Sequence, residues 1–219
     1  MPSELPFVSC LCPTYRRPQM MANTIPCFIT QDYPADRREL IILDDAGELK
    51  NETGDGWQII SIPRRFRSLP EKFNALAGLA QGEILVVWED DDLYLQHHIS
   101  MHVRAMEGRL WSKPSSVLST YTGKHEVEDA TGRFHASLAF RREVFDRIGG
   151  WPLTKRGDFD QQLIARLTAI EVPGDPCQLD SPSYIFRWSR TNAYHGQAFM
   201  RGPEDEDRKS TRLNSSHRT

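Results

Sequence analysis

The sequence lacks the features that define several common classes of protein. Its 219 residues contain no apolar run close to the roughly 20 residues that a membrane-spanning helix needs. The first six residues, MPSELP, offer neither the basic segment nor the apolar core of a secretory signal. We therefore expect a cytoplasmic protein with no membrane span, of a length that suits a single domain.

Cysteine is scarce. The chain has four cysteines, and none of them stands at the paired spacings that bind zinc. Cys10 and Cys12 lie in an apolar, strand-like run, Cys27 in a helical pattern and Cys177 in a loop. We expect all four to be reduced thiols, as in most intracellular proteins.

Acidic residues outnumber basic residues except at the C-terminus. Residues Asp207–Thr219 carry four basic residues against one acidic residue, and they resemble the translation of a common sequencing adapter. We predict a non-native, disordered tail there, with the natural chain cut short near Glu206. Without it the 27 basic and 30 acidic residues fall to 23 and 29, a net charge of −6. A net-acidic body without a basic stripe argues against a nucleic-acid partner.

Buried-strand patterns alternate with helical patterns along the first half of the chain. Apolar runs predict four strands, and helical spacing predicts three helices between and after them. The strands are Phe7–Cys12, Glu39–Leu43, Trp57–Ile62 and Glu83–Trp88, and the helices are Arg17–Thr30, Pro70–Gln81 and Leu95–Met106. This alternation predicts an α/β fold, in which a mainly parallel twisted sheet is covered by helices on both faces.

The second half of the chain is less regular. Two strands, a polar hairpin or loop and two helices are predicted there: Ser116–Thr120, His135–Phe140, Tyr121–Gly132, Arg142–Ile148 and Asp158–Thr168. We expect these segments to add a smaller mixed region to the main sheet. His97 and His98 open a predicted helix, and we expect them at the surface.

The fourth predicted strand runs directly into four acidic residues, Glu89–Asp92. Such a row is tolerable only if a cation or a ring of hydrogen-bond donors neutralises it. Thr14, Asp45 and Asp91 each follow a predicted strand, and ligands of parallel sheets bind beyond the carboxyl ends of the strands. The pattern predicts a metal-assisted ligand site, and a solvated acidic turn that caps the next helix is the alternative.

Five segments in order carry a resemblance to a known family. They are Val8–Pro18, Gln31–Pro34, Ile42–Asp45, Lys72–Asn74 with Ala80–Glu83, and the acidic residues with Leu93–Tyr94. Together they resemble the nucleotide-sugar half of a family 2 glycosyltransferase with the GT-A fold, over Phe7 to about Ala169. The resemblance implies inverting transfer of a sugar from a nucleotide-diphosphate-sugar, with UDP-sugars favoured, to a saccharide or other hydroxyl acceptor. It also implies Mn²⁺ or Mg²⁺ as cofactor.

The resemblance also assigns residues to the donor and the metal. The nucleotide-binding residues would be Pro13, Thr14, Tyr15, Arg17, Asp44, Asp45, Lys72, Asn74 and Asp90. The metal would bind Asp91 and Glu89, with His195 as a late ligand from a C-terminal loop. Tyr15 offers a uracil ring a stacking face, and Asp45 would accept its imide N–H. An ordinary strand-to-helix turn at Thr14 and Tyr15, with a helix cap at Asp44 and Asp45, is the competing interpretation.

A general base is needed to deprotonate the acceptor hydroxyl. The segment Gly157–Arg166 resembles the acidic motif of the family, which places the base at Asp160, with Asp158 as the second choice. Phe159 stands where the family usually carries glutamate, so both registers stay open. The alternative is that both aspartates only cap their helix.

Two other functions are compatible with much of this pattern. A sugar-nucleotide nucleotidyltransferase would share the fold class and the metal, but Pro13–Pro18 lacks the glycines of its phosphate loop. A catalytically incomplete fragment that only binds a nucleotide is the second alternative. We expect one GT-A domain over residues 1–206, with a nucleotide-sugar half to about residue 110 and an acceptor half beyond it.

Overall fold

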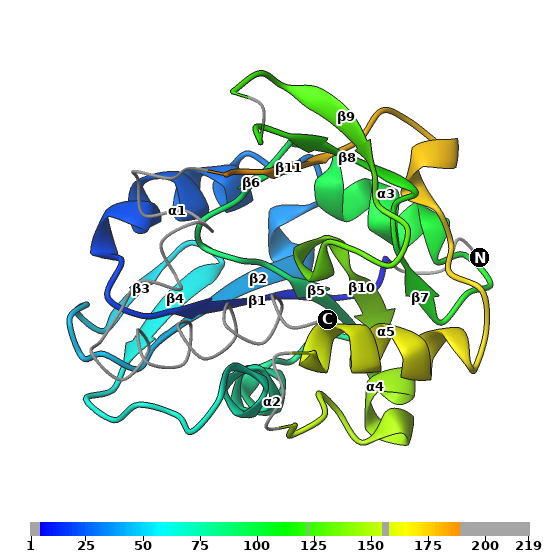
Figure 1. Ribbon diagram of the computed structural model, residues 1–219. Coiled ribbons are helices and arrows are strands. Elements are labelled where there is room, and N and C mark those ends of the chain that lie inside the picture. Colours follow the sequence, from blue (N-terminus) through cyan, green and yellow to red (C-terminus); the bar gives the residue numbers. More distant parts are fainter. Residues whose placement is uncertain (1–4, 122, 155–157, 189–219) are drawn as a thin grey trace, which may run out of the picture.

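A seven-stranded sheet forms the centre of the computed structural model, which describes residues 5–121, 123–154 and 158–188 (Figure 1). The strand order is β3-β4-β2-β1-β5-β10-β7. The strands are β1 (Val8–Thr14), β2 (Arg38–Asp44), β3 (Glu52–Gly54), β4 (Trp57–Ser61), β5 (Ile84–Val87), β7 (Trp111–Ser112) and β10 (Ala139–Arg141).

The four central strands are parallel, as their continuous apolar runs predict. β1 pairs in parallel with β2 and β5, and β2 pairs in parallel with β4. Every residue of β1 and β5 is buried, because helices cover both faces of the sheet. The antiparallel strands β3, β10 and β7 lie outside this core. The carboxyl ends of β1, β2 and β5 therefore meet at one edge, where the polar clusters were expected.

Helices cover the two faces of the sheet in separate groups. The α-helices are α1 (Met21–Ile29), α2 (Leu69–Leu79), α3 (His98–Ala105), α4 (Arg142–Ile148) and α5 (Phe159–Thr168). Figure 1 shows α1 and α3 on one face and α2, α4 and α5 on the other. Single 3₁₀ turns occupy Pro18–Met20, Ala35–Arg37, His135–Ser137 and Pro176–Gln178. No helix of the described residues is long and apolar enough to cross a bilayer.

A second sheet of four strands lies beside α3 (Figure 1). It runs in the order β6 (Leu93–Tyr94), β11 (Tyr184–Phe186), β8 (Ser116–Ser119) and β9 (Glu126–Asp129). β8 and β9 form the hairpin expected around Tyr121–Gly132. β11 returns from the end of the described chain to pair with β6, directly after the acidic residues. This sheet is the smaller mixed region that the sequence predicted.

Two boundaries differ from the sequence prediction. Pro13, expected to close the first strand, lies inside β1 and pairs with Leu43. The carbonyl oxygen of Leu11 accepts a hydrogen bond from Trp88 N, so Leu11 faces β5. Pro13, two residues later, faces the same side, but β5 has already ended there. No partner strand therefore needs an N–H from Pro13. The helix expected from Arg17 begins at Met21, because Arg16 adopts a left-handed conformation (φ 56°) and the next turn is 3₁₀.

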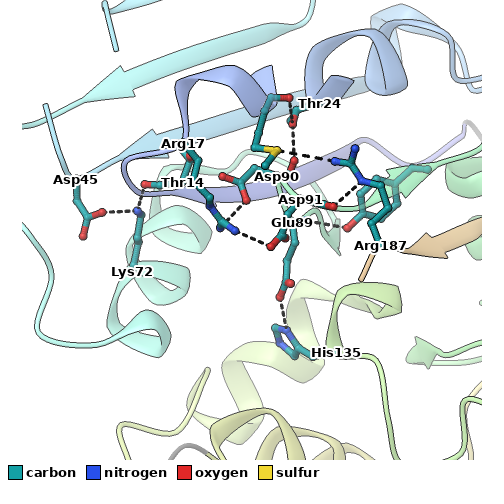
Figure 2. Close-up of polar contacts among 12 residues, drawn as sticks. Thr14, Arg17, Thr24, Asp45, Lys72, Glu89, Asp90, Asp91, His135 and Arg187 are labelled. Atoms are coloured by element: carbon teal, nitrogen blue, oxygen red, sulfur yellow. Dashed lines mark hydrogen bonds and ion pairs between the residues drawn. The ribbon is translucent and has the colours of Figure 1, made fainter. Parts of the chain in front are cut away.

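The predicted strand His135–Phe140 is wrong in its first half. Phe134 has a positive φ of 58°, which turns the chain into a 3₁₀ helix at His135–Ser137 before β10 begins at Ala139. A left-handed conformation is unusual for so bulky a residue. Its result is that His135 points toward the carboxyl edge of the sheet rather than into a ladder, as Figure 2 shows.

The expectation that His98 lies at the surface is also wrong. His98 and His102 are fully buried on α3, with ring centroids 4.5 Å apart. His98 Nδ1 lies 2.9 Å from Ser183 Oγ, and His102 Nδ1 lies 2.6 Å from Ser112 Oγ. Burial lowers the pKa of His98 well below its usual range and that of His102 to about 3. Both rings are therefore neutral in the folded protein near pH 7.

This buried pair predicts a loss of stability in mild acid. The unfolded chain protonates histidine near pH 6.5, whereas the folded chain does not, so the free energy of unfolding falls as the pH drops below about 6.5. His102, with its pKa near 3 in the folded protein, should cost about 2 kcal/mol between pH 7 and pH 5, and His98 should add to this loss. Urea denaturation at several pH values measures this slope, and His102→Gln should make it shallower. An equal slope in the two proteins would contradict the assignment.

Candidate active site

The acid loop, Glu89–Asp92, leaves β5 at the carboxyl edge of the sheet and is held by its backbone. Thr24 Oγ1 of α1 donates to the Asp90 carbonyl at 3.1 Å. Arg187 Nε donates to the Asp91 carbonyl at 2.7 Å. The hydroxyl of Tyr94, in β6, accepts from Glu89 N at 2.7 Å. Contacts from three separate elements therefore hold the loop in place (Figure 2).

Arg17 neutralises the centre of the acid loop. Its Nη1 lies 2.5 Å from Asp91 Oδ2, and its Nη2 lies 2.6 Å from Asp90 Oδ1. Burial raises the pKa of Asp90 to about 7, since the stabilising charge of Arg17 is offset by neighbouring Asp91. Burial opposes the charge of Arg17 as well, but the two aspartates outweigh it and raise the pKa of the guanidinium.

The two ends of the acid loop have donors of their own. Asp92 accepts from the hydroxyl of Tyr184 and, at 2.9 Å, from Arg187 N. Asp92 thus anchors β11 and does not cap α3, whose N-cap residue is His97. His135 Nδ1 lies 3.4 Å from Glu89 Oε1. Hydrogen-bond donors reach the carboxylates of Glu89, Asp91 and Asp92, and the ion pair with Arg17 neutralises that of Asp90. The row of acids is thus compensated, as its sequence required.

The acid loop also fits a hard divalent cation. Glu89, Asp91 and Asp92 can each bring one oxygen to a group whose members all lie within 4.8 Å of one another. Carboxylate oxygens are the ligands that Mg²⁺ and Mn²⁺ prefer, usually with the remaining positions filled by water and phosphate. Asp92 was not predicted as a ligand. The predicted late ligand His195 lies outside the described residues.

A small cavity of about 160 Å³ lies beside the ends of β1 and β2. It is lined by Tyr15, Asp45, Arg65, Phe66, Arg67, Ser68, Leu69 and Lys72. Asp45 accepts from Lys72 Nζ at 2.5 Å and from Phe66 N at 2.9 Å, and Lys72 also donates to the Thr14 carbonyl. The guanidinium of Arg65 lies 4.3 Å from the centre of the Tyr15 ring. The structure thus brings Thr14, Tyr15, Asp45 and Lys72 together.

Asp44 and Asn74 lie close to this region but contact other parts of the protein. The carboxylate of Asp44 accepts from the backbone N–H groups of Ala46, Glu48 and Leu49, and from Ser61 Oγ. Burial alone would raise the pKa of Asp44, but these four hydrogen bonds lower it. Asn74 exchanges two 2.9 Å hydrogen bonds with the backbone of Trp151. Both side chains therefore stabilise loops that shape the site.

A larger cavity of about 460 Å³ brings the acid loop and α5 together. Its lining consists of Glu89, Arg133, Phe134, His135, Ala136, Phe159, Asp160, Gln161, Tyr184 and Phe186. Asp160 faces this cavity and accepts from Gln161 N at 2.8 Å. Asp158 is not in the lining and lies 3.1 Å from Gln162 Nε2. Asp158 is the N-cap residue of α5, but its side chain makes no capping hydrogen bond. The alternative, in which both aspartates only cap the helix, required such a bond.

His135, Tyr184 and Arg187 were not predicted as site residues. Trp151 Nε1 donates to His135 Nε2 at 2.7 Å, so Nδ1 carries the ring proton and faces Glu89. Tyr184 begins the short strand β11 and Arg187 follows it, and one partner of that strand, β6, comes about 90 residues earlier in the chain. The arginine–tryptophan pair at Arg187 and Trp188 is the one sequence signal for them. It resembles an element of processive polysaccharide synthases, but Tyr184 stands where those carry glutamine, which disfavours processivity.

The comparisons with known proteins agree with this geometry. The family model described as glycosyl transferase family 2 matches residues 9–159. The chain therefore belongs to glycosyl transferase family 2, and the resemblance read from its five motifs is confirmed. No curated protein sequence matches the chain significantly.

Solved structures confirm the GT-A fold. The mannosyltransferase PcManGT from Pyrobaculum calidifontis, in complex with GDP-Man and Mn²⁺, is 19% identical with a TM-score of 0.63. The match covers 90% of this chain and 61% of PcManGT. S. aureus TarS 1-349 in complex with UDP-GlcNAc is 13% identical with a TM-score of 0.67, over 91% of this chain and 63% of TarS. The chain thus spans less than two thirds of either relative.

Proposed function

We propose that this chain transfers a sugar from a nucleotide-diphosphate-sugar to a hydroxyl acceptor with inversion, assisted by a divalent cation. The observation that carries the proposal is that Glu89 of the acid loop and Asp160 of α5 line one cavity. Donor complexes of the two structural relatives, with GDP-Man and UDP-GlcNAc, support the donor class.

The small cavity suits the nucleoside. Tyr15 supplies an aromatic face, and Asp45 supplies a buried acceptor for a ring N–H, which uracil and guanine both carry. Lys72 holds Asp45 in place at 2.5 Å. Asp44 acts one step away, by fixing the loop from Ala46 to Leu49, and Asn74 holds Trp151, whose indole N–H donates to His135. A UDP-sugar remains the favoured donor.

The diphosphate lies between the two cavities in this proposal, beside Arg17 and the acid loop. Thr14, Arg17 and Asp91 occupy that position between Asp45 and Glu89 (Figure 2). The side chain of Asp90 has no exposed surface, so a contact with the ribose requires Arg17 to move. A cation held by Asp91 and Glu89 would neutralise the charge that develops on the departing diphosphate.

Asp160 is the proposed general base. Its carboxylate takes the proton of the acceptor hydroxyl while the acceptor oxygen bonds to the anomeric carbon. The bond from that carbon to the diphosphate oxygen breaks, and the nucleoside diphosphate leaves from the opposite face. The aromatic rings of Phe134, Phe159 and Phe186 give the acceptor apolar walls that exclude water.

No observation on the described residues favours either of the two alternative functions. A nucleotidyltransferase needs a backbone cradle for a triphosphate after the first strand, whereas Thr14–Arg17 contains no glycine. An incomplete fragment would bind a nucleotide without turnover. The group needed for turnover would then belong to the C-terminal part of the protein, and residues 189–219 lie outside the described residues.

A thermal-shift screen of nucleotide sugars, with and without Mn²⁺, tests the proposal. A donor at 100 times its dissociation constant should raise the free energy of unfolding by about 2.7 kcal/mol. We expect the stabilisation to require both the donor and the cation. If no nucleotide sugar stabilises the protein under either condition, the proposed donor site is wrong.

A further inference from the structure

Arg17 lies against two of the carboxylates in the acid loop. It makes two close ion pairs, at 2.5 Å to Asp91 and 2.6 Å to Asp90, while 19% of its side chain is exposed. The neighbouring carboxylates Asp90 and Asp91 are 0% and 4% exposed. The acid loop is thus already paired with one positive charge.

A metal ion and this guanidinium compete for the same carboxylate, that of Asp91. Asp91 Oδ2 accepts from Arg17 Nη1, and Asp91 belongs to the group of carboxylates that can converge on a cation. A neighbouring positive charge weakens the binding of a second cation to a carboxylate, by about tenfold or more at such distances in a buried site. Metal binding therefore has to displace Arg17 or overcome its repulsion.

The guanidinium of Arg17 can leave the carboxylates by rotation of its long side chain. The residue lies outside any α-helix or strand, between Arg16 in the left-handed region (φ 56°) and the 3₁₀ turn Pro18–Met20. A guanidinium that leaves a carboxylate needs another anion, and phosphate oxygens match its planar fork. The donor diphosphate is the anion that the proposed function brings to this place.

We propose that Arg17 competes with the metal for the acid loop. It keeps the Mn²⁺ affinity of the nucleotide-free protein low until a nucleoside diphosphate draws the guanidinium away. The proposal rests on the proposed function. Its thermodynamic consequence is positive coupling: the diphosphate strengthens metal binding, and the metal strengthens diphosphate binding by the same factor. Arg17 thus acts as a positioning residue that links the two.

Mn²⁺ binding to the whole chain, followed by electron paramagnetic resonance of the free ion, tests the idea without any turnover. In the absence of nucleotide, Arg17→Gln should bind Mn²⁺ about tenfold or more tightly than the wild type. Addition of UDP should strengthen Mn²⁺ binding strongly in the wild type and much less in Arg17→Gln. Arg16→Gln is the matched control, since it removes the same charge from a side chain that is 62% exposed and 3.9 Å from Glu48.

Arg17→Gln leaves buried Asp90 without its counter-ion, so a second variant guards against misfolding. Arg17→Gln with Asp90→Asn removes both charges and should also bind Mn²⁺ more tightly than the wild type. Unchanged or weaker Mn²⁺ binding in both Arg17 variants would overturn this inference alone, and so would an equal gain in Arg16→Gln. If no protein, the wild type included, binds Mn²⁺ even with UDP, this inference and the metal part of the proposed function both fail.

Discussion

The Asp160→Asn variant should turn over about 100-fold more slowly than the wild type, or slower still, while binding the nucleotide-sugar donor equally well. Asparagine keeps the size of the side chain and its hydrogen bond to Gln161 N, but it cannot take a proton from the acceptor. A general base interacts with the attacking hydroxyl in the transition state, so the loss should appear in kcat and not in donor affinity.

Steady-state transfer assays with calorimetry of donor binding measure the two quantities separately. Asp158→Asn is the matched control, because Asp158 precedes the same helix but lies outside the large cavity. We expect that variant to transfer sugar within a few-fold of the wild type. The opposite ranking of the two variants would move the base to Asp158 and shift the register of the acidic motif by two residues.

Asp91→Asn should abolish the dependence of nucleoside diphosphate affinity on Mn²⁺. The variant removes a charged oxygen that the cation needs, so the loss should exceed the about 10- to 100-fold typical of residues that only support a ligand. Repulsion among four acids alone would predict a gain in stability. Because Arg17 pairs with Asp91 at 2.5 Å, we expect a small loss instead.

Calorimetry of UDP binding with and without Mn²⁺ measures the first effect, and thermal unfolding measures the second. Asp92→Asn separates the two acids, since Asp92 bonds to Tyr184 and Arg187 and should mainly lower stability. Retention of full Mn²⁺ dependence in Asp91→Asn, together with its loss in Asp92→Asn, would transfer the ligand role to Asp92.

Much of the site could be predicted because its residues directly follow the carboxyl ends of strands. Continuous apolar runs such as Leu40–Leu43 specify buried parallel strands, and parallel strands present their carboxyl ends at one edge. The placement of Tyr15, Asp45 and the acid loop follows from that rule alone. The family motifs then supplied the donor class, which no rule of periodicity contains.

Other parts were decided by contacts between distant segments. The strands β6 and β11 are two and three residues long, too short for any periodic signal, and they exist because each pairs with the other across about 90 residues. The first turn of the helix expected from Arg17 and the first half of the strand expected from His135 did not form, because each follows a single left-handed residue, Arg16 or Phe134. Sequence alone does not show such a turn when the residue is not glycine.

The sequence by itself determined the α/β class, the order of the central strands along the chain and the acids that end them. Only the tertiary structure decided what those acids contact: Arg17 on Asp90 and Asp91, His135 on Glu89, and Tyr184 on Asp92. The physical reason is that burial and strand period are local properties of a segment. The partner of a buried charge depends instead on which distant backbone the fold brings within about 3 Å of it.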